Sequence, residues 1–287
     1  MSHPVKGIDH VFLLVKDLDA SAETYRRLGF TISPRGTHSP EMGSANYTFV
    51  FEDDYAELLG VIADTPQSRQ KTEMIERDGE GLRAIACRID DAREAKAALG
   101  DLGIATGEVR DFSRPLPLPD GSTGTAAFAV CQFAPEEIPL GVVFMCQHKT
   151  PDMVWRPELK SHANSAVGIA TVTLVTEAPE AKAEACARLY AAGAITTDPE
   201  GNLRVTTGER SGDILILTPQ AAAARWSAEA VTATPATGFA ALSLWVSDLA
   251  RTRSALEASA VPFHAEAGRI WVEPAHGSGA IIEFLPR

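Results

Sequence analysis

Apolar residues along this chain gather in short β-branched runs, which alternate with segments where apolar residues recur at helical spacing. The first run, residues 8–15, predicts a strand because Ile, Val, Phe and Leu fill it. Residues 17–28 then follow helical spacing, from a capping aspartate to a stop at Gly29. Further runs predict strands at residues 30–33, 46–51 and 55–61. The segment therefore predicts a strand, a helix and three more strands.

The same order of elements recurs along the rest of the chain. A second unit begins with a strand at 82–89 and a helix at 91–99, and further units cover 168–218 and 238–285. Fixed-order repetition of this kind decides a fold more firmly than any single motif. We therefore predict an α+β fold of four βαβββ units, arranged as two pseudo-symmetric halves with curved sheets. The predicted domains are 1–150 and 167–287, joined by a linker at 151–166.

Three connecting segments carry predictions of their own. Residues 114–121 contain three prolines, which cannot donate to a sheet, and therefore predict a loop. Residues 105–109 predict a strand of the second unit. The alanine-rich segment 220–230 predicts a helical connector between the third and fourth units.

Charge and composition exclude several classes of function. The formal net charge is −12 and no Lys/Arg cluster is present, which argues against nucleic-acid and anionic-membrane partners. No apolar stretch reaches the roughly 18 residues of a membrane helix. The four cysteines lie far apart and the first residues do not resemble a secretory signal. These features predict a soluble cytoplasmic protein with reduced, buried thiols.

The strand period of two gives the first candidate for chemistry. His10 should share a face with Ile8, Phe12 and Leu14, and Glu57 should share a face with apolar residues of its own strand. If these are the concave faces, an imidazole and a carboxylate meet in an apolar cleft, which suits a divalent metal. From the periodicity alone, His10 can equally be a core histidine satisfied by Glu57 or by a backbone carbonyl.

The segments 9–18, 25–30 and 55–58 resemble the opening unit of the glyoxalase, bleomycin-resistance and extradiol-dioxygenase superfamily, the vicinal oxygen chelate proteins. The resemblance implies that His10 and Glu57 are ligands of a divalent metal ion such as Zn, Fe, Mn or Ni. It covers nearly the whole chain in the order of units, but it is specific to residues only over 8–59. The third and fourth units place Thr171 and Ala241 where His10 stands in the first, so the second half predicts no metal site.

The ligand set that the resemblance implies is incomplete in the second unit. Alanine or arginine stands where a ligand histidine is expected there, and His148 can complete the site only if its strand end curls inward. His38 and Asn46, in a polar loop at the predicted cleft mouth, are candidate substrate contacts, or they belong to a simple connecting loop. Arg156 and His162 in the linker can cover the cleft and bind substrate, or they pack the two halves together.

The sequence thus favours a metal-dependent lyase or isomerase, with dioxygenase chemistry as a further option, acting on a small oxygenated molecule. The metal would be held by His10, Glu57 and His148, and Glu57 would also transfer the proton. The alternative is a metal-free protein that sequesters a ligand, as bleomycin-resistance relatives do. In either case the second half can be a degenerate copy retained for packing or for forming a homodimer.

Overall fold

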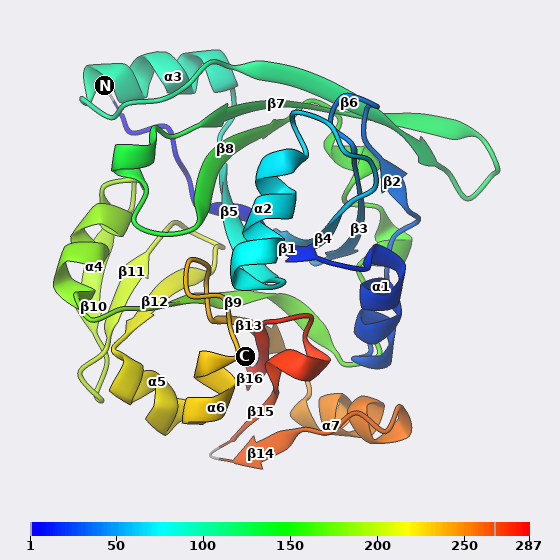
Figure 1. Cartoon of the computed structure of the whole chain (residues 1–287), viewed down its shortest axis with the longest axis vertical. Coiled ribbons are helices and arrows are strands. Elements are labelled where there is room, and N and C mark those ends of the chain that lie inside the picture. The colour runs from blue at the N-terminus through cyan, green and yellow to red at the C-terminus, as the bar shows by residue number, and fades with distance from the viewer. Residues whose placement is uncertain (1, 267) are drawn as a thin grey trace.

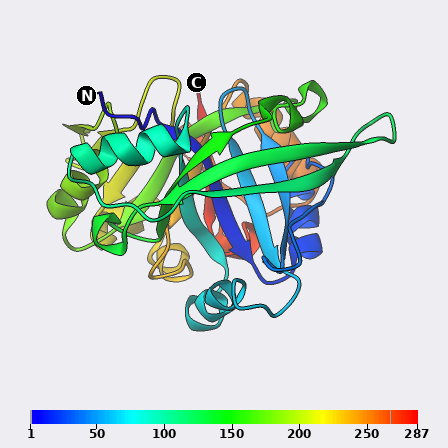
Figure 2. The same cartoon turned by 90° about the horizontal axis from the view of Figure 1, so that it is seen from above.

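The computed structural model describes residues 2–266 and 268–287 and contains two eight-stranded sheets (Figure 1 and Figure 2). The first sheet has the strand order β2-β3-β4-β1-β5-β8-β7-β6 and the second has β10-β11-β12-β9-β13-β16-β15-β14. In both sheets the strands of two units meet at the centre, through β1 with β5 and β9 with β13. The predicted α+β fold of four units in two pseudo-symmetric halves is therefore confirmed.

The strands of the first sheet are β1 Ile8–Val15, β2 Gly36–Thr37, β3 Ser44–Val50, β4 Tyr55–Val61, β5 Gly81–Arg88, β6 Arg110–Pro117, β7 Thr123–Gln132 and β8 Val142–His148. Those of the second are β9 Ala166–Val175, β10 Ala194–Thr197, β11 Leu203–Thr206, β12 Asp213–Leu217, β13 Ala241–Val246, β14 His264–Glu266, β15 Arg269–Val272 and β16 Ile281–Pro286. The predicted linker lies between β8 and β9.

The helices are α1 Leu18–Arg27, α2 Arg69–Asp78, α3 Ala92–Asp101, α4 Pro179–Ala187, α5 Pro219–Arg225, α6 Ala228–Thr232 and α7 Leu249–Ala258. Short 3₁₀ turns occur at Pro135–Glu137, Pro151–Met153, Pro157–Leu159 and Pro274–His276. The predicted cap of α1 is present, because the Asp17 side chain accepts a hydrogen bond from the backbone N–H of Ala20. None of the helices that the structure describes has the length and apolar character needed to cross a bilayer.

Several predicted elements were wrong. Residues 30–33 and 105–109 form no strand, and the short strand β2 lies instead inside the segment predicted as a loop. The proline-rich segment was the larger error, because residues 114–117 belong to β6 and pair with β7. β6 is an end strand of its sheet, and Pro115 and Pro117 are alternate residues. Their missing donors can therefore both face the unpaired edge, which is where a sheet tolerates proline.

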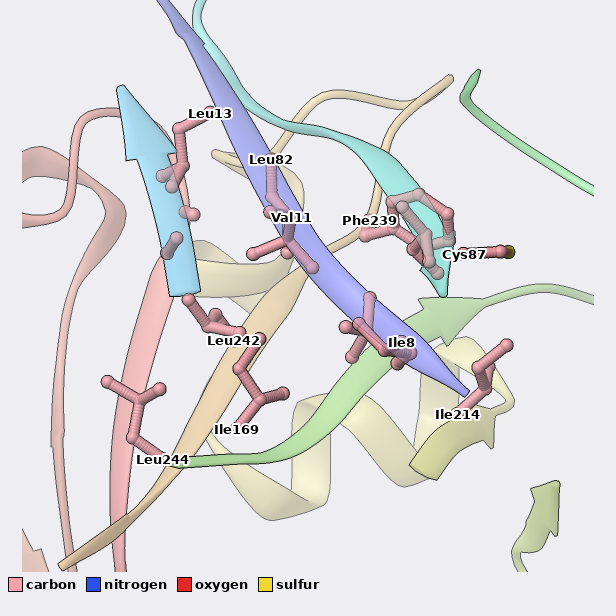
Figure 3. Close-up of a cluster of buried hydrophobic side chains, with 14 of the residues drawn as sticks. Ile8, Val11, Leu13, Leu82, Cys87, Ile169, Ile214, Phe239, Leu242 and Leu244 are labelled. Atoms are coloured by element: carbon pink, nitrogen blue, oxygen red, sulfur yellow. The ribbon is translucent and has the colours of Figure 1, made fainter. Parts of the chain in front are cut away.

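The two sheets pack against each other through their apolar faces. Figure 3 shows Val11 and Leu13 of β1 facing Ile169 of β9 and Leu242 of β13 across this interface. The buried cysteines Cys87, Cys131, Cys146 and Cys186 are free thiols, as predicted. The opposite face of the first sheet is left to line the concave side of that half.

A β-bulge at Asp9 changes how β1 presents its side chains. Ile8 pairs with Cys87 and His10 with Ala86, so Asp9 is an extra residue without a partner across the pair. Ile8 consequently joins Val11 and Leu13 in the inter-sheet core, and the prediction that it shares a face with His10 was wrong. The bulge also lets two consecutive residues, Asp9 and His10, direct their side chains toward each other.

The concave side of the second sheet is filled by the connector that precedes the fourth unit. The predicted helical connector consists of two short helices, α5 and α6. Ser227 caps the start of α6, so the connector is interrupted at this point. Trp226 between them packs in one buried cluster with Leu215, Ala241 and Trp271 of the sheet. Figure 1 shows both helices lying against this sheet. In the first half the corresponding connector is α2, which has no buried residue and leaves space beneath it.

Candidate functional site

A cavity of about 220 Å³ lies on the concave side of the first sheet, and we call it the first-half cavity. Its walls are mainly apolar and include the four phenylalanines Phe12, Phe112, Phe128 and Phe144. Its titratable lining groups are His10, His38, Tyr55, Glu57, Lys71, Arg114 and Cys146. A small apolar cavity with a few converging polar groups is the usual form of a ligand site.

His10 is held in one orientation by contacts on both sides of its ring. Its Nδ1 lies 2.7 Å from Asp9 Oδ1, and its ring stacks on Tyr55 with centroids 4.3 Å apart. Because the Asp9 carboxylate can only accept, Nδ1 carries a proton, and in the neutral imidazole Nε2 is then the nitrogen with the lone pair. That Nε2 lines the cavity and faces Glu57 Oε2 at 3.9 Å.

Asp9 is a buried hub for two imidazoles. Its Oδ1 lies 2.8 Å from His148 Nε2 as well as 2.7 Å from His10 Nδ1. Burial by itself would raise the pKa of Asp9, but the two imidazoles, His148 above all, outweigh it and hold that pKa well below its ordinary range. Asp9 is therefore a carboxylate throughout the physiological pH range.

Glu57 is positioned from the side by Asn46. The Asn46 side-chain amide donates to Glu57 Oε1 at 2.8 Å, and both residues are buried in the cavity wall. β3 and β4 supply the two residues and pair Asn46 with Leu59 and Thr48 with Glu57, so adjacent strands fix their separation. Glu57 Oε1 is thus occupied, while Oε2 faces His10.

Two arrangements of these groups can be compared with metal geometry. Asp9, His10, Cys146 and His148 offer four ligand atoms within 4.8 Å of one another, so a metal ion could be held among them. Ligands about 2.0–2.1 Å from a tetrahedral ion stand about 3.3 Å apart. The Asp9–imidazole separations of 2.7 and 2.8 Å are shorter and match hydrogen bonds. In this arrangement the cluster therefore holds His10 in place through hydrogen bonds.

The pair that faces the cavity also lies within the distance that one metal ion can span. Two ligands that each bind an ion at about 2.1 Å can be at most about 4.2 Å apart. The 3.9 Å between His10 Nε2 and Glu57 Oε2 satisfies this limit with a wide angle at the ion. Asp9 behind His10 and Asn46 beside Glu57 are the outer partners that such ligands require. These two residues therefore fit a divalent ion whose other positions are left for substrate or water.

The second unit supplies apolar residues at the matching positions. Phe12 pairs with Glu57 in the first unit, and Ala86 pairs with Phe144 in the second, so Phe144 corresponds to Glu57. Two residues earlier on each first strand, Ala84 corresponds to His10. The incomplete ligand set expected from the sequence is thus visible as an apolar wall of the cavity.

The structure places the other predicted site residues in two groups. His38 and Asn46 line the cavity, and burial lowers the pKa of His38. His148 does not line it, since its Nε2 is directed at Asp9 and its ring packs on Trp155 of the linker. Its predicted role as a metal ligand stays a prediction.

The two linker candidates lie away from the cavity lining. Arg156 donates to the backbone carbonyl of Pro117 and to the carboxylate of Glu158. His162 is buried between the halves, where its Nδ1 accepts from the Thr31 N–H and its Nε2 donates to the Val50 carbonyl. Burial lowers the pKa of His162 to about 4, so it is a neutral packing residue at physiological pH.

Sequence reasoning missed three residues of this site. The sequence did not suggest Asp9 as a partner of His10, because neighbouring residues of a regular strand point to opposite faces. Arg114 was assigned to a loop, yet β6 brings it into the cavity wall. Lys71 comes from α2, an unpredicted helix whose end is held by Arg83 through the Gly79 carbonyl. The spacing of three residues between Lys71 and Met74, which places both on one side of a helix, is the signal that could have suggested Lys71.

The fourth unit has a carboxylate, Glu283, at the strand position that Glu57 holds in the first unit, and this carboxylate is paired with two arginines. Glu283 is fully buried and accepts from Arg225 at 2.9 Å, from Arg269 at 2.9 Å and from the Ser243 hydroxyl at 2.7 Å. Arg225 belongs to α5, the helix that fills this concave face. The bulge of β1 recurs in β9, with Ala170 and Thr171 where the first half has Asp9 and His10. The second half keeps the fold and has different chemistry.

Comparisons with known proteins agree with this fold. The sequence model described as a glyoxalase-like domain matches residues 8–190, which is more than half of the chain. A solved structure of a hypothetical protein from Staphylococcus aureus is similar at a TM-score of 0.69 and 11% identity, covering 98% of this chain and 99% of that one. A mutant of 4-hydroxymandelate synthase from Streptomyces coelicolor gives a TM-score of 0.60 at 14% identity, covering 99% and 93%. At these identities both likenesses concern the fold. No protein of curated function matches the sequence.

Proposed function

The chain belongs to the glyoxalase-like domain family, and on that premise we propose that it is a metal-dependent lyase or isomerase acting in the first-half cavity. The observation that carries the proposal is the pairing of His10 Nε2 with Glu57 Oε2 across 3.9 Å inside an apolar cavity. Each partner is supported from outside the cavity, by Asp9 and by Asn46. The substrate is a small molecule that carries oxygen on adjacent carbons.

We assign the ligand roles for a divalent ion to His10 and Glu57. Such an ion, when bound, polarises substrate oxygens as a Lewis acid and stabilises negative charge on them. Glu57 also has the position to accept a proton from a carbon next to a carbonyl group and to return it at a neighbouring atom. Asn46 holds the second oxygen of Glu57 during this transfer. The phenylalanine walls exclude water, which strengthens these interactions.

Metal content of the purified protein is the first test. We expect near-stoichiometric divalent metal in wild-type protein and its loss in His10→Ala and Glu57→Ala. The control is His264→Ala, which removes an exposed histidine of the second half. Metal at 100 times its dissociation constant should stabilise wild type by about 2.7 kcal/mol, and the two cavity variants should lose this gain. Retention of metal by both cavity variants would contradict the ligand assignment.

The reaction class has a separate test. Small oxo and hydroxy compounds are incubated with the protein in D₂O, and loss of the C–H signal next to the carbonyl is followed by NMR. We expect exchange that requires Glu57 and is lost in Glu57→Gln. Exchange at the wild-type rate in that variant would refute the proton-transfer role.

A second candidate function has an observation of its own. Ala84 and Phe144 stand where a complete ligand set would need donors, which favours a metal-free protein that sequesters a small apolar ligand. The same measurements separate the two. Absence of any metal-dependent stabilisation, together with stabilisation by an apolar ligand, would select the binding protein.

A further inference from the structure

Arg114 is a buried charge without an ion-pair partner in the part of the chain that the structure describes. The residue is 7% exposed, lines the first-half cavity, and has no carboxylate within 4.0 Å of its nitrogens. Its Nη1 is fully buried and makes no hydrogen bond to the described residues. A buried guanidinium is costly unless an anion or several acceptors compensate it. The missing acceptor for Arg114 is therefore a group that a ligand could supply.

The lack of a side chain at Gly36 leaves space for the Arg114 guanidinium. A Cβ added to Gly36 would lie 2.4 Å from Arg114 Nη1 and 2.3 Å from Asn46 Oδ1. Asn46 Oδ1 is likewise buried without a hydrogen-bond partner among the described residues. A glycine in β2 thus lets Arg114 and Asn46 converge, and Asn46 connects this place to Glu57 through its amide. The unsatisfied groups lie beside the proposed reaction centre.

The charge balance of the cavity contrasts with that of the whole chain. The protein has a net charge of −12, but its cavity lining holds two cations, Arg114 and Lys71, against one carboxylate, Glu57. A local excess of positive charge in an acidic protein is suited to attract an anion. Without a bound metal ion the lining carries one excess positive charge, which a monoanion balances and a phosphate dianion exceeds.

The cavity also limits what can be attached to that anion. A cavity of about 150 Å³ accommodates a benzene ring. About 220 Å³ with phenylalanine walls therefore holds one ring, or an alkyl body of similar size, together with a few polar atoms. Arginine binds the planar carboxylate through two parallel N–H donors, and that geometry suits a ligand anchored at one end.

We propose that Arg114 is a specificity-determining residue that binds the carboxylate of the substrate, so that the substrate class is a small aryl- or alkyl-substituted oxo or hydroxy acid. The assignment rests on the proposed function for the oxygen atoms at His10 and Glu57. The carboxylate lies at Arg114 and the apolar body lies between the phenylalanines. Lys71, at the edge of α2, adds positive charge at the entrance.

The experiment measures binding by calorimetry with four matched probes: 3-phenylpropanoate, phenylpyruvate, 3-phenylpropanamide and phenyl phosphate. We expect both carboxylates to bind and the neutral amide to bind far more weakly. Arg114→Met should weaken carboxylate binding roughly 10- to 100-fold, which is the range for losing hydrogen bonds to a charged group. Arg110→Met is the matched control, since Arg110 lies on the same strand, is exposed and does not line the cavity.

Unfolding measurements separate recognition from a structural role. Because Arg114 is an unpaired buried charge in the free protein, Arg114→Met should leave the thermal midpoint unchanged or raised. A lowered midpoint would identify Arg114 as a structural residue and overturn the proposal. Equal affinity for the amide and the carboxylate, or tighter binding of phenyl phosphate, would overturn the substrate class.

The two proposals fail in distinguishable ways. His10→Ala should lose metal and still bind 3-phenylpropanoate through Arg114. If no metal is found but carboxylate binding depends on Arg114, the enzymatic proposal fails and the carboxylate site stands. If metal binds as expected but Arg114→Met binds carboxylates like wild type, the enzymatic proposal stands and the role of Arg114 is refuted.

Discussion

Replacing Asp9 with asparagine tests whether the hub behind His10 matters for the site. The carboxylate accepts hydrogen bonds from His10 at 2.7 Å and from His148 at 2.8 Å, and the residue is 3% exposed. Both imidazoles bond to one oxygen, Oδ1, and an asparagine keeps that oxygen without its negative charge, so both hydrogen bonds are weakened. A hydrogen bond to a charged group contributes about 1.5–3 kcal/mol and a neutral one about 0.5–1.5 kcal/mol, so weakening both bonds should lower the unfolding free energy by about 1–3 kcal/mol. Outer partners of metal ligands typically contribute about 10- to 100-fold in metal affinity.

The assay for Asp9→Asn combines urea unfolding, metal titration and NMR of the His10 ring nitrogens. We expect lower stability, weaker metal binding and loss of the single Nδ1-protonated form of His10. The control is Asp90→Asn, because Asp90 is an exposed aspartate whose side chain pairs with Lys6. Wild-type metal affinity and an unchanged His10 tautomer in Asp9→Asn would refute the reasoning, whatever the change in stability.

The same hub predicts a pH dependence of stability. Because the pKa of Asp9 is depressed in the folded protein, its stabilising contribution is present above the ordinary aspartate pKa of about 3.9 and is lost as the pH falls below it. Asp9→Asn should therefore lose less stability than wild type between neutral pH and acid. Parallel acid-unfolding curves for the two proteins would contradict the assigned carboxylate state.

Three further predictions concern the rest of the molecule. Burial raises the pKa of Asp54 to about 8, although the hydrogen bond from the Ile169 N–H opposes this rise. Because the folded pKa is raised, the unfolding free energy falls as the pH rises from about 4 to 8. Asp54→Asn should therefore raise the unfolding free energy at pH 9 by about 1–3 kcal/mol relative to its effect at pH 5, and denaturant curves at both values would show it. Glu283→Ala removes the carboxylate that pairs with Arg225 and Arg269, so it should lower the unfolding free energy in urea by about 3–5 kcal/mol. Binding of 3-phenylpropanoate in the other half should stay unchanged. Trp226→Ala should lower the unfolding free energy by about 3–5 kcal/mol, because it leaves a cavity between the helices and the concave face of the second sheet. A melting temperature equal to that of wild type would show that this face is not packed as described.

Much of the architecture was determined by the sequence alone. The order of elements repeats four times, and local signals such as the Asp17 cap act over a few residues, so they can be read without tertiary information. His10 and Glu57 were correctly placed as residues that point with apolar neighbours, because the strand period of two is a local property. The free, buried cysteines followed in the same way from the apolar runs around them.

The tertiary structure decided what depends on partners distant in sequence. Whether proline can stand in β6 depends on its place at the edge of the sheet, and this strand order delivers Arg114 to the cavity. The bulge that brings Asp9 to His10 exists only in the pairing of β1 with β5. Helices α5 and α6 fill one concave face while α2 leaves the other open, although both are connectors between units. Pairing register and packing are set by residues far apart in the chain, so a local pattern can name the candidates for a site but only the folded protein brings them together.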